Sequence, residues 1–600
     1  MEVQPAQNNS LTPSQQQAVT ARGNVLVMAG AGTGKTKTLV ERCLDCLERE
    51  RAGLDELLIV TFTEAAAAEM RQRLRKQLEQ KAAAHPADEH WPKQLALFDV
   101  AHIGTLHSFC LRLVREHFYE LGLDPQFAVL DEGETRQRAN ETLDEIFQAH
   151  YAGDDEFSMA VQNLIQIYGG GRDENIRKLV LRLHNYSQAR PDPAGWLAGQ
   201  IGNFFAFTAA AWQRWLLEAI AGCRNEWLPV LENLQAANAK AAELKEIIFR
   251  VIGNFSRESA AEILEQVVSA DGEWPAKKKT VLRKPLEKIF DEAAFLASLA
   301  VVKAGTDPLA EDWSWVRGQM VTLLRLAQEF AGGFSGRKLA DGVLDFHDLE
   351  QFALKLLWDF TAGCPTTVAR AWQKKLKFIF VDEYQDINAA QDKIIQALSC
   401  DRSAPVPGGN RFLVGDVKQS IYRFRLADPK IFRDYAHIWR NEAGGIVSLS
   451  ENFRSREGLL DFVNSVCRLV MREEVGGVGY DADAELKPGR RPGETPGGPD
   501  QSGAFGQAAA REDPPPQNIS AGQAARPTVV QPRVDLLLRF KAGRNDALED
   551  ADGELADLDE AQKEARLVAL RLKKLVEEKH AIWDGHNQTF RTVKWGDVAI

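Results

Sequence analysis

"NVLVMAGAGTGKTKTLVERCLDCL", residues 24–47, places an apolar run, a glycine-rich turn and a helix-forming segment in immediate succession. This succession predicts a strand over 25–28, a phosphate-binding loop, and a helix that begins near Lys35. The usual pattern has glycine where this chain has Ala29, but alanine costs little there if its φ is negative. The stretch therefore predicts an α/β fold in which a parallel sheet is flanked by helices.

The loop carries the chemistry needed to hold nucleotide phosphates. Its glycines let backbone N–H groups converge on phosphate oxygens beside the positive end of a helix. Lys35 would reach the β- and γ-phosphates, and the Thr36 hydroxyl would hold Mg²⁺. The residues expected around the phosphates are Ala29, Gly30, Ala31, Gly32, Thr33, Gly34, Lys35 and Thr36.

A second stretch, "KFIFVDEYQDIN" over 377–388, reads as a buried strand that ends in two carboxylates. Asp382 would coordinate Mg²⁺ through water, and Glu383 would orient and deprotonate the attacking water. Alone this is a weak signal, because acidic residues commonly follow strands. Together with the loop it predicts a site for ATP and Mg²⁺, and the long spacing between Lys35 and Asp382 predicts a large insertion.

Composition limits where a nucleic acid could bind. The chain has 600 residues, enough for about four domains, and a net charge of −12. This acidic balance argues against a protein that coats nucleic acid by bulk electrostatics, so any DNA contact must be local. Seven scattered cysteines, and no apolar run long enough to span a bilayer, favour a cytoplasmic location.

Five further segments fix a motif order. They are LTPSQQQAV (11–19), TFTEAAAAEMRQRL (61–74), GTLHSF (104–109), FLVGDVKQSIYRFRLADP (412–429) and LSENFRS (449–455). With the two stretches above, this order resembles the Q motif and motifs I, Ia, Ib, II, III and IV of the UvrD/RecB-like helicases of superfamily one. Residues 105–134, YSQARPDPAGWL (186–197) and LDFHDLEQFALKLL (344–357) resemble the AddA branch, a helicase-nuclease subunit of bacterial double-strand break repair. A RecB-type subunit is the alternative.

The resemblance implies roles around the nucleotide. Gln15 would read adenine through its amide, and Phe453 would stack on the base where many members have tyrosine. Gln419 would link the γ-phosphate to the DNA site. Arg425 and Arg454 would reach the γ-phosphate, to which a guanidinium fork is well matched. The expected catalytic residues are Lys35, Glu383, Gln419, Arg425 and Arg454.

For DNA, the same motifs supply stacking rings and hydroxyl groups. Tyr422 and Phe424 alternate with arginines, so an extended backbone would put both rings on one side. A lone aromatic residue more often belongs to a core, but the motif context favours base stacking. The rings expected to stack are Phe62, Tyr422 and Phe424, and the residues expected at backbone phosphates are Thr61, Thr63, His107 and Ser108.

The pattern along the chain predicts RecA-like motor domains with a large helical insert. The first motor domain is expected at 1–110 and 342–445, and the insert at 111–341. A partial second motor domain is expected at 446–600, interrupted by a Pro/Gly-rich excursion at about 488–560. The chain ends in what reads as a strand, so we expect the second domain to be incomplete. No nuclease segment is assignable.

The function implied by the resemblance is an ATP-driven motor on single-stranded and tailed duplex DNA. It would move with 3′ to 5′ polarity in double-strand break repair, beside an AddB-like second subunit. Because the second domain reads as incomplete, this chain is expected to bind Mg-ATP, hydrolyse it slowly and not unwind duplex. The alternative is a nucleotide-gated DNA-binding or scaffold protein with an idle ATPase. A transporter-type ATPase would not explain TLHSF or IYRFR.

Overall fold

The structure is a computed structural model, and it divides into two compact units. One unit comprises residues 1–455 and 464–494, and the other comprises 456–463 and 495–600. No helix among the described residues is long and apolar enough to cross a membrane. The described residues are 11–206, 210–250, 255–272, 274–275, 278–302, 305–400, 409–441, 445–473, 478–482, 484–489, 560–584 and 589–595.

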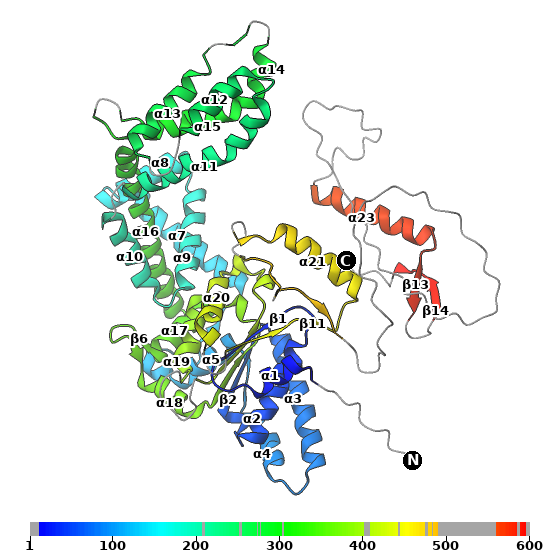
Figure 1. The fold of residues 1–600 in the computed structure, drawn as a ribbon. Helices are drawn as coiled ribbons and strands as arrows, with labels where there is room; N and C mark the ends of the chain where they lie inside the picture. The colour runs from blue at the N-terminus through cyan, green and yellow to red at the C-terminus, as the bar shows by residue number, and fades with distance from the viewer. Residues whose placement is uncertain are drawn as a thin grey trace, which may run out of the picture. The chain divides into compact units, whose positions relative to one another are not determined.

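A six-stranded parallel sheet is the centre of the first unit (Figure 1). Its strand order is β10-β1-β9-β8-β2-β3. Its four inner strands read as nearly continuous apolar runs because both faces are covered, as is usual for parallel sheets. The predicted fold class is thereby confirmed. The strands are β1 Val25–Ala29, β2 Leu57–Thr61, β3 His102–Thr105, β8 Phe378–Val381, β9 Arg411–Gly415 and β10 Gly445–Leu449.

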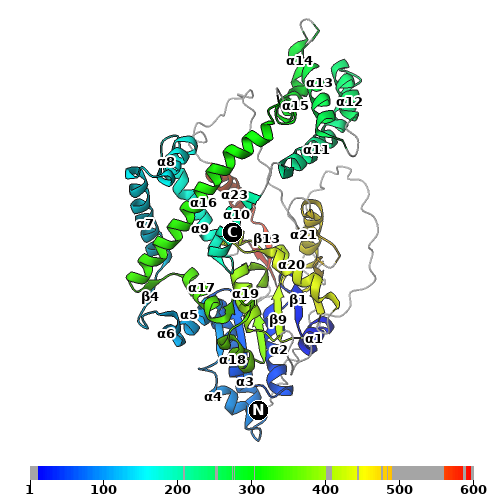
Figure 2. The same ribbon diagram turned by 90° about the vertical axis from the view of Figure 1, so that its left-hand side faces the viewer.

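Helices cover both faces of this sheet, as Figure 2 also shows. Leu26 and Leu58 point into a core shared with α5, α17 and α19. Val27 and Ile59 point the other way, into a core shared with α2 and α3. The alternation of side chains along a strand explains this division. The helices of this part are α1 Pro13–Thr20, α2 Lys35–Arg49, α3 Glu64–Ala84, α4 His90–Ala96, α5 Leu106–Glu116, α6 Phe118–Leu121, α17 Phe346–Leu357, α18 Thr367–Lys375, α19 Ala389–Leu398 and α20 Pro429–Ile438.

The described residues within 130–342 are mainly helical (Figure 1). Their buried side chains form two further cores. One core joins α7–α10 to the long α16, and the other joins α11–α13 to α15. A short pairing of β4 Ala128–Val129 with β5 Val343–Leu344 brings the two ends of this segment together. The helices are α7 Glu132–Ala152, α8 Glu156–Tyr168, α9 Glu174–Gln188, α10 Pro193–Ala206, α11 Ala210–Leu234, α12 Ala239–Phe249, α13 Arg257–Ser269, α14 Lys279–Arg283, α15 Glu287–Ala300 and α16 Pro308–Ala340.

The end of the first sheet differs from the sequence-based boundary. All five residues of β10 pair with β1, from Val25↔Gly445 to Ala29↔Leu449, so the boundary at 445/446 falls inside a strand. The next strand, β11 Glu451–Asn452, pairs with β12 Lys487–Pro488 in the same unit. An apolar strand cannot be assigned to one of two sheets by sequence pattern alone.

The described part of the second unit contains the helix α23 Glu560–Glu577. A hairpin follows it, formed by β13 Ala581–Asp584 and β14 Thr589–Thr592. The excursion predicted at 488–560 lies outside the described residues, apart from its ends. Of the strand predicted at 593–600, residues 596–600 also lie outside them, and 593–595 are not a strand. The partial second motor domain therefore stays a prediction.

Candidate nucleotide and nucleic-acid site

The phosphate-binding loop, residues 30–34, connects β1 to α2 in the predicted order. Gly32 and Gly34 have φ of +72° and +86°, which favour glycine. A Cβ at Gly34 would lie 2.8 Å from Nε2 of Gln15, and a Cβ at Gly32 would lie 2.8 Å from Cβ of Arg454. Ala29 is the last residue of β1 and needs no positive φ, so the departure from the usual pattern introduces no strain.

Lys35 and Glu383 form an ion pair at the carboxyl edge of the sheet. The ammonium Nζ lies 2.8 Å from Oε2 and 3.0 Å from Oε1. Glu383 adopts φ +52°, an uncommon conformation for glutamate that costs on the order of 1–3 kcal/mol and occurs preferentially at functional sites. The predicted phosphate-binding lysine and the predicted general base therefore hold each other in this structure.

Asp382 is a partly buried carboxylate directly after β8. Burial, and to a lesser extent the charge of Glu383, raise its pKa to about 6, although the charge of Lys35 acts to lower it. Among the described residues Asp382 has no ion-pair partner of its own, and Lys35 is the cation whose charge acts on it. Carboxylate and hydroxyl oxygens are the ligands that Mg²⁺ prefers, and Asp382 and Thr36 supply them.

A chain of hydrogen bonds leads from Glu383 to motif III. The buried amide of Gln385 donates to Oε2 of Glu383 at 2.8 Å, and its oxygen accepts from the backbone N–H of Asp416 at 2.9 Å. The Gln419 amide donates to Oδ2 of Asp416 at 2.7 Å. Sequence reasoning identified Gln419 and Glu383 but missed Gln385 and Asp416. Both lie inside the quoted motifs, so their positions were signalled although their roles were not.

Motif IV lies directly on the phosphate-binding loop. The Asn452 amide donates to the carbonyl of Ala31 at 2.6 Å, and the backbone N–H of Phe453 donates to the carbonyl of Gly32 at 2.9 Å. The Asn452 oxygen accepts from the N–H of Arg454 at 2.8 Å, which fixes the local turn. Asn452 is another residue that sequence reasoning missed. The expected contacts of Phe453 with adenine and of Arg454 with the γ-phosphate stay predictions.

Gln15 joins the first helix to the loop. Its side chain is only 4% exposed, its Nε2 donates to the carbonyl of Thr33 at 3.0 Å, and its Oε1 accepts from the N–H of Thr12 at 3.1 Å. Both ends of the amide are thus engaged within the protein. Gln15 therefore positions the loop, and its contact with adenine stays a prediction.

The three predicted stacking rings form one cluster, which we call the aromatic cluster: Phe62, Tyr422 and Phe424. The ring centroids of Phe62 and Tyr422 are 4.7 Å apart, and those of Tyr422 and Phe424 are 5.7 Å apart. Residues 423–425 form a 3₁₀ turn rather than an extended segment, and the turn brings the two rings together. Arg425 lies 5.6 Å from the Tyr422 ring, and Phe424 is 75% exposed. An exposed ring suits base stacking.

The hydroxyls predicted at backbone phosphates have local partners. Thr61 donates to the carbonyl of Thr63 at 3.1 Å, and the Thr63 oxygen caps α3 by accepting from Ala66 N–H at 3.1 Å. Ser108 donates to the carbonyl of Thr105 at 2.8 Å. A phosphate only accepts hydrogen bonds, so the hydroxyls of Thr61 and Ser108 would have to leave these acceptors to bind one. Their contact with DNA stays a prediction.

His107 is held by a buried carboxylate on α17. Its Nε2 lies 2.9 Å from Oε1 of Glu350, which is 1% exposed and also accepts from Gln391 at 2.6 Å. Burial lowers the pKa of His107, but the hydrogen bond and charge of Glu350 and the charge of Glu64 outweigh it, so the pKa is raised. Glu350 lies in the quoted segment 344–357, but no pattern there linked it to His107.

Comparison with known proteins decides the family. Residues 11–438 match the model of the UvrD/REP helicase N-terminal domain. The chain belongs to the UvrD/REP helicase family. This confirms the ATP-dependent helicase family that the motif order predicted.

Several curated relatives of the chain are named as the A subunit of an ATP-dependent helicase/nuclease. One from Pelotomaculum thermopropionicum is 33% identical over 99% of this chain and 48% of its own length. Those from Listeria welshimeri and Bacillus cereus are 32% and 31% identical, over 99% and 98% of this chain and 47% of each relative. The chain spans about half the length of these relatives.

Proposed function

We propose that this chain is the ATP-driven motor part of a DNA helicase that moves along single-stranded DNA. The observation that carries the proposal is the continuous polar connection from Lys35 to Gln419 through Glu383, Gln385 and Asp416. Gln419 stands three residues before Tyr422 of the aromatic cluster. The nucleotide site and the candidate DNA site therefore share one hydrogen-bonded element.

ATP binding would begin by replacing a contact of this structure. The γ-phosphate attracts the Lys35 ammonium, which then leaves Glu383 and frees its carboxylate to accept a proton from water. Thr36 and Asp382 would hold Mg²⁺, which neutralises charge on the phosphates. When Glu383 changes partner, Gln385 loses its 2.8 Å contact with Glu383 and keeps the longer one with Asp386, so that Asp416 can move with the Gln385 amide. A ligand shifts an equilibrium only through such a difference in contacts.

The DNA side would use the aromatic cluster as a sequence-independent platform. Stacking of bases on such rings is worth about 1–3 kcal/mol per base and reads no sequence. Because Tyr422 and Phe424 follow Gln419 closely, a change at Gln419 alters the rings that hold the strand. Alternating grip and release would give translocation. The 3′ to 5′ polarity follows from the family resemblance alone.

The whole protein would act on tailed duplex DNA in double-strand break repair. Its relatives are named as the A subunit of a helicase/nuclease, which supports an AddA-type protein with a second, AddB-like subunit over a RecB-type one. The described cysteines are all free thiols, which supports a cytoplasmic location.

ATP hydrolysis with and without single-stranded DNA tests the proposal. The wild-type chain is expected to hydrolyse ATP faster when oligothymidine is added, and Lys35→Ala is expected to lose turnover while remaining folded by circular dichroism. A scaffold with an idle ATPase would show no turnover in either protein. Unwinding of 3′-tailed but not 5′-tailed duplex by the complex with its second subunit tests the polarity.

A further inference from the structure

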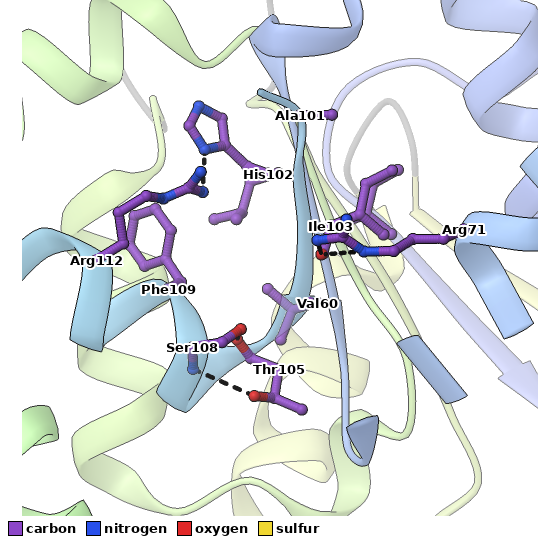
Figure 3. Close-up of a pocket in the computed structure, with 12 residues that line it drawn as sticks. Val60, Arg71, Ala101, His102, Ile103, Thr105, Ser108, Phe109 and Arg112 are labelled. Carbon is purple, nitrogen blue, oxygen red and sulfur yellow. Dashed lines mark hydrogen bonds between the residues drawn. The ribbon is translucent and has the colours of Figure 1, made fainter. Parts of the chain in front are cut away.

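A cavity of about 180 Å³ lies along β3, the edge strand of the sheet. Its walls come from α3 on one side of the strand and α5 on the other (Figure 3). Two arginines, Arg71 of α3 and Arg112 of α5, line it together with His102 and Ser108. We call this cavity the edge pocket. None of the predicted roles uses its two guanidinium groups.

Each guanidinium is oriented by one contact and keeps further N–H groups. Arg71 donates from Nε to the carbonyl of Ile103 at 3.0 Å, and its Nη2 donates to the same oxygen. Arg112 donates from Nη2 to Nδ1 of His102 (Figure 3). Among the described residues, Nη1 of Arg71 and the Nε and Nη1 groups of Arg112 have no hydrogen-bond acceptor. The pocket therefore presents oriented donors.

The edge pocket holds two arginines whose charges act on each other, and the charge of Glu116 also acts on Arg112. Neither Arg71 nor Arg112 forms an ion pair with a described residue. Burial lowers the pKa of Arg112, the charge of Glu116 raises it and the charge of Arg71 lowers it, so the two arginines oppose each other. Burial and the charges of Arg112 and Lys375 lower the pKa of His102 to about 3, which leaves its ring neutral. An anion that enters the pocket would be attracted by both guanidinium groups and would offset their mutual repulsion.

We propose that the edge pocket binds a backbone phosphate of the DNA strand, a contact that rests on the proposed function. Guanidinium groups match phosphate oxygens in geometry and are always charged. Ser108, at the start of α5, lines the pocket and was itself predicted at a phosphate. Gly104 allows the close approach of Ser108 to β3, since a Cβ at Gly104 would lie 2.5 Å from Oγ of Ser108.

The first experiment measures binding of fluorescent oligothymidine over a series of salt concentrations. In Arg71→Gln/Arg112→Gln, affinity is expected to fall several-fold and the slope of log K against log salt to flatten by about 0.7 for each phosphate lost. Arg73→Gln/Arg75→Gln on the same helix is the matched control, because these exposed arginines pair with Glu69 and Glu79. Unchanged ATP hydrolysis without DNA shows that the variants are folded. The single variant Arg112→Gln serves as a second test, because it leaves the contact of Arg71 with the Ile103 carbonyl intact.

The second experiment moves a single neutral methylphosphonate linkage along the oligonucleotide. Wild-type protein is expected to lose affinity at the position that occupies the edge pocket, and the double variant is expected to lose that positional effect. The inference is overturned if the double variant has the same salt slope and the same methylphosphonate profile as the wild type. This holds even if calorimetry detects inorganic phosphate or an acidic peptide bound in the pocket. If wild-type protein binds no single-stranded DNA at all, the proposed function fails instead, so the two failures are distinguishable.

Discussion

The phosphate-binding loop and the aromatic cluster are built in opposite ways. The loop is held by polar contacts from three distant segments: Gln15 binds the Thr33 carbonyl, Asn452 binds the Ala31 carbonyl, and Glu383 binds Lys35. The aromatic cluster is held mainly by ring contacts, and its outer ring, Phe424, is largely exposed. A phosphate chain needs fixed donors, whereas bases of any sequence need only exposed flat surfaces. Small changes should therefore be costly at the loop and tolerated better at the rings.

The largest effect is expected from Glu383→Gln, which removes the general base but keeps the shape of the side chain. Hydrolysis of bound ATP should fall by about 10²- to 10⁴-fold, the usual contribution of such a group. ATP binding should be retained, because Lys35 no longer has to break an ion pair with residue 383 before it contacts the phosphates. Single-turnover hydrolysis and binding of a non-hydrolysable analogue separate the two effects.

The matched control for that variant is Glu56→Gln. In the wild type, Oε2 of Glu56 lies 2.7 Å from Nζ of Lys377, and this pair is not part of the nucleotide site. It should hydrolyse ATP as the wild type does. Normal hydrolysis in Glu383→Gln would mean that the Lys35–Glu383 pair is only structural.

Removing both outer rings should affect DNA and spare the nucleotide. Tyr422→Ala/Phe424→Ala is expected to weaken single-strand binding by about 2–6 kcal/mol if both rings stack on bases. ATP hydrolysis without DNA should change little, because neither ring contacts the loop. Phe360→Ala, which removes another exposed phenyl ring, is the control. Unchanged affinity, measured by fluorescence anisotropy, would assign the rings to packing and remove their contrast with the loop.

Asn452 tests whether the loop depends on its contact with motif IV. Asn452→Ala removes the donor to Ala31 and the acceptor for Arg454 N–H, and should weaken nucleotide binding by about 1–3 kcal/mol. Asn452→Asp keeps the acceptor for Arg454 N–H but places a negative charge beside the Ala31 carbonyl and the phosphates of ATP, so it should bind nucleotide at least as weakly as Asn452→Ala. Calorimetric titration with a non-hydrolysable ATP analogue measures both. Equal affinity in all three proteins would show that the loop is held without motif IV.

The strands and local motifs were predictable because they depend on neighbouring residues. The run Val25–Ala29, the glycines at positive φ and the Asp382–Glu383 pair each carry a short-range pattern that physical chemistry explains. The sheet to which β10 belongs was not predictable, because its apolar residues suit either of two sheets. Glu350 and Asn452 were missed as site residues for a related reason. Their partners, His107 and Ala31, are hundreds of residues away, and no spacing in the sequence records a contact that only the fold creates.

The smallest effect concerns pH and His107, which is predicted to contact DNA and is held by Glu350 at 2.9 Å. Its pKa is raised above its usual value of about 6.5 by Glu350 and Glu64, although burial opposes this. A raised pKa keeps the imidazolium charged to higher pH, so affinity for single-stranded DNA should fall as pH rises through that pKa. Glu350→Gln removes the main negative charge beside the ring and should move the midpoint to lower pH, with a change of about threefold in affinity at neutral pH. His107→Asn should abolish this pH dependence, and a midpoint that is equal in wild type and Glu350→Gln would show that the Glu350 contact does not tune DNA binding.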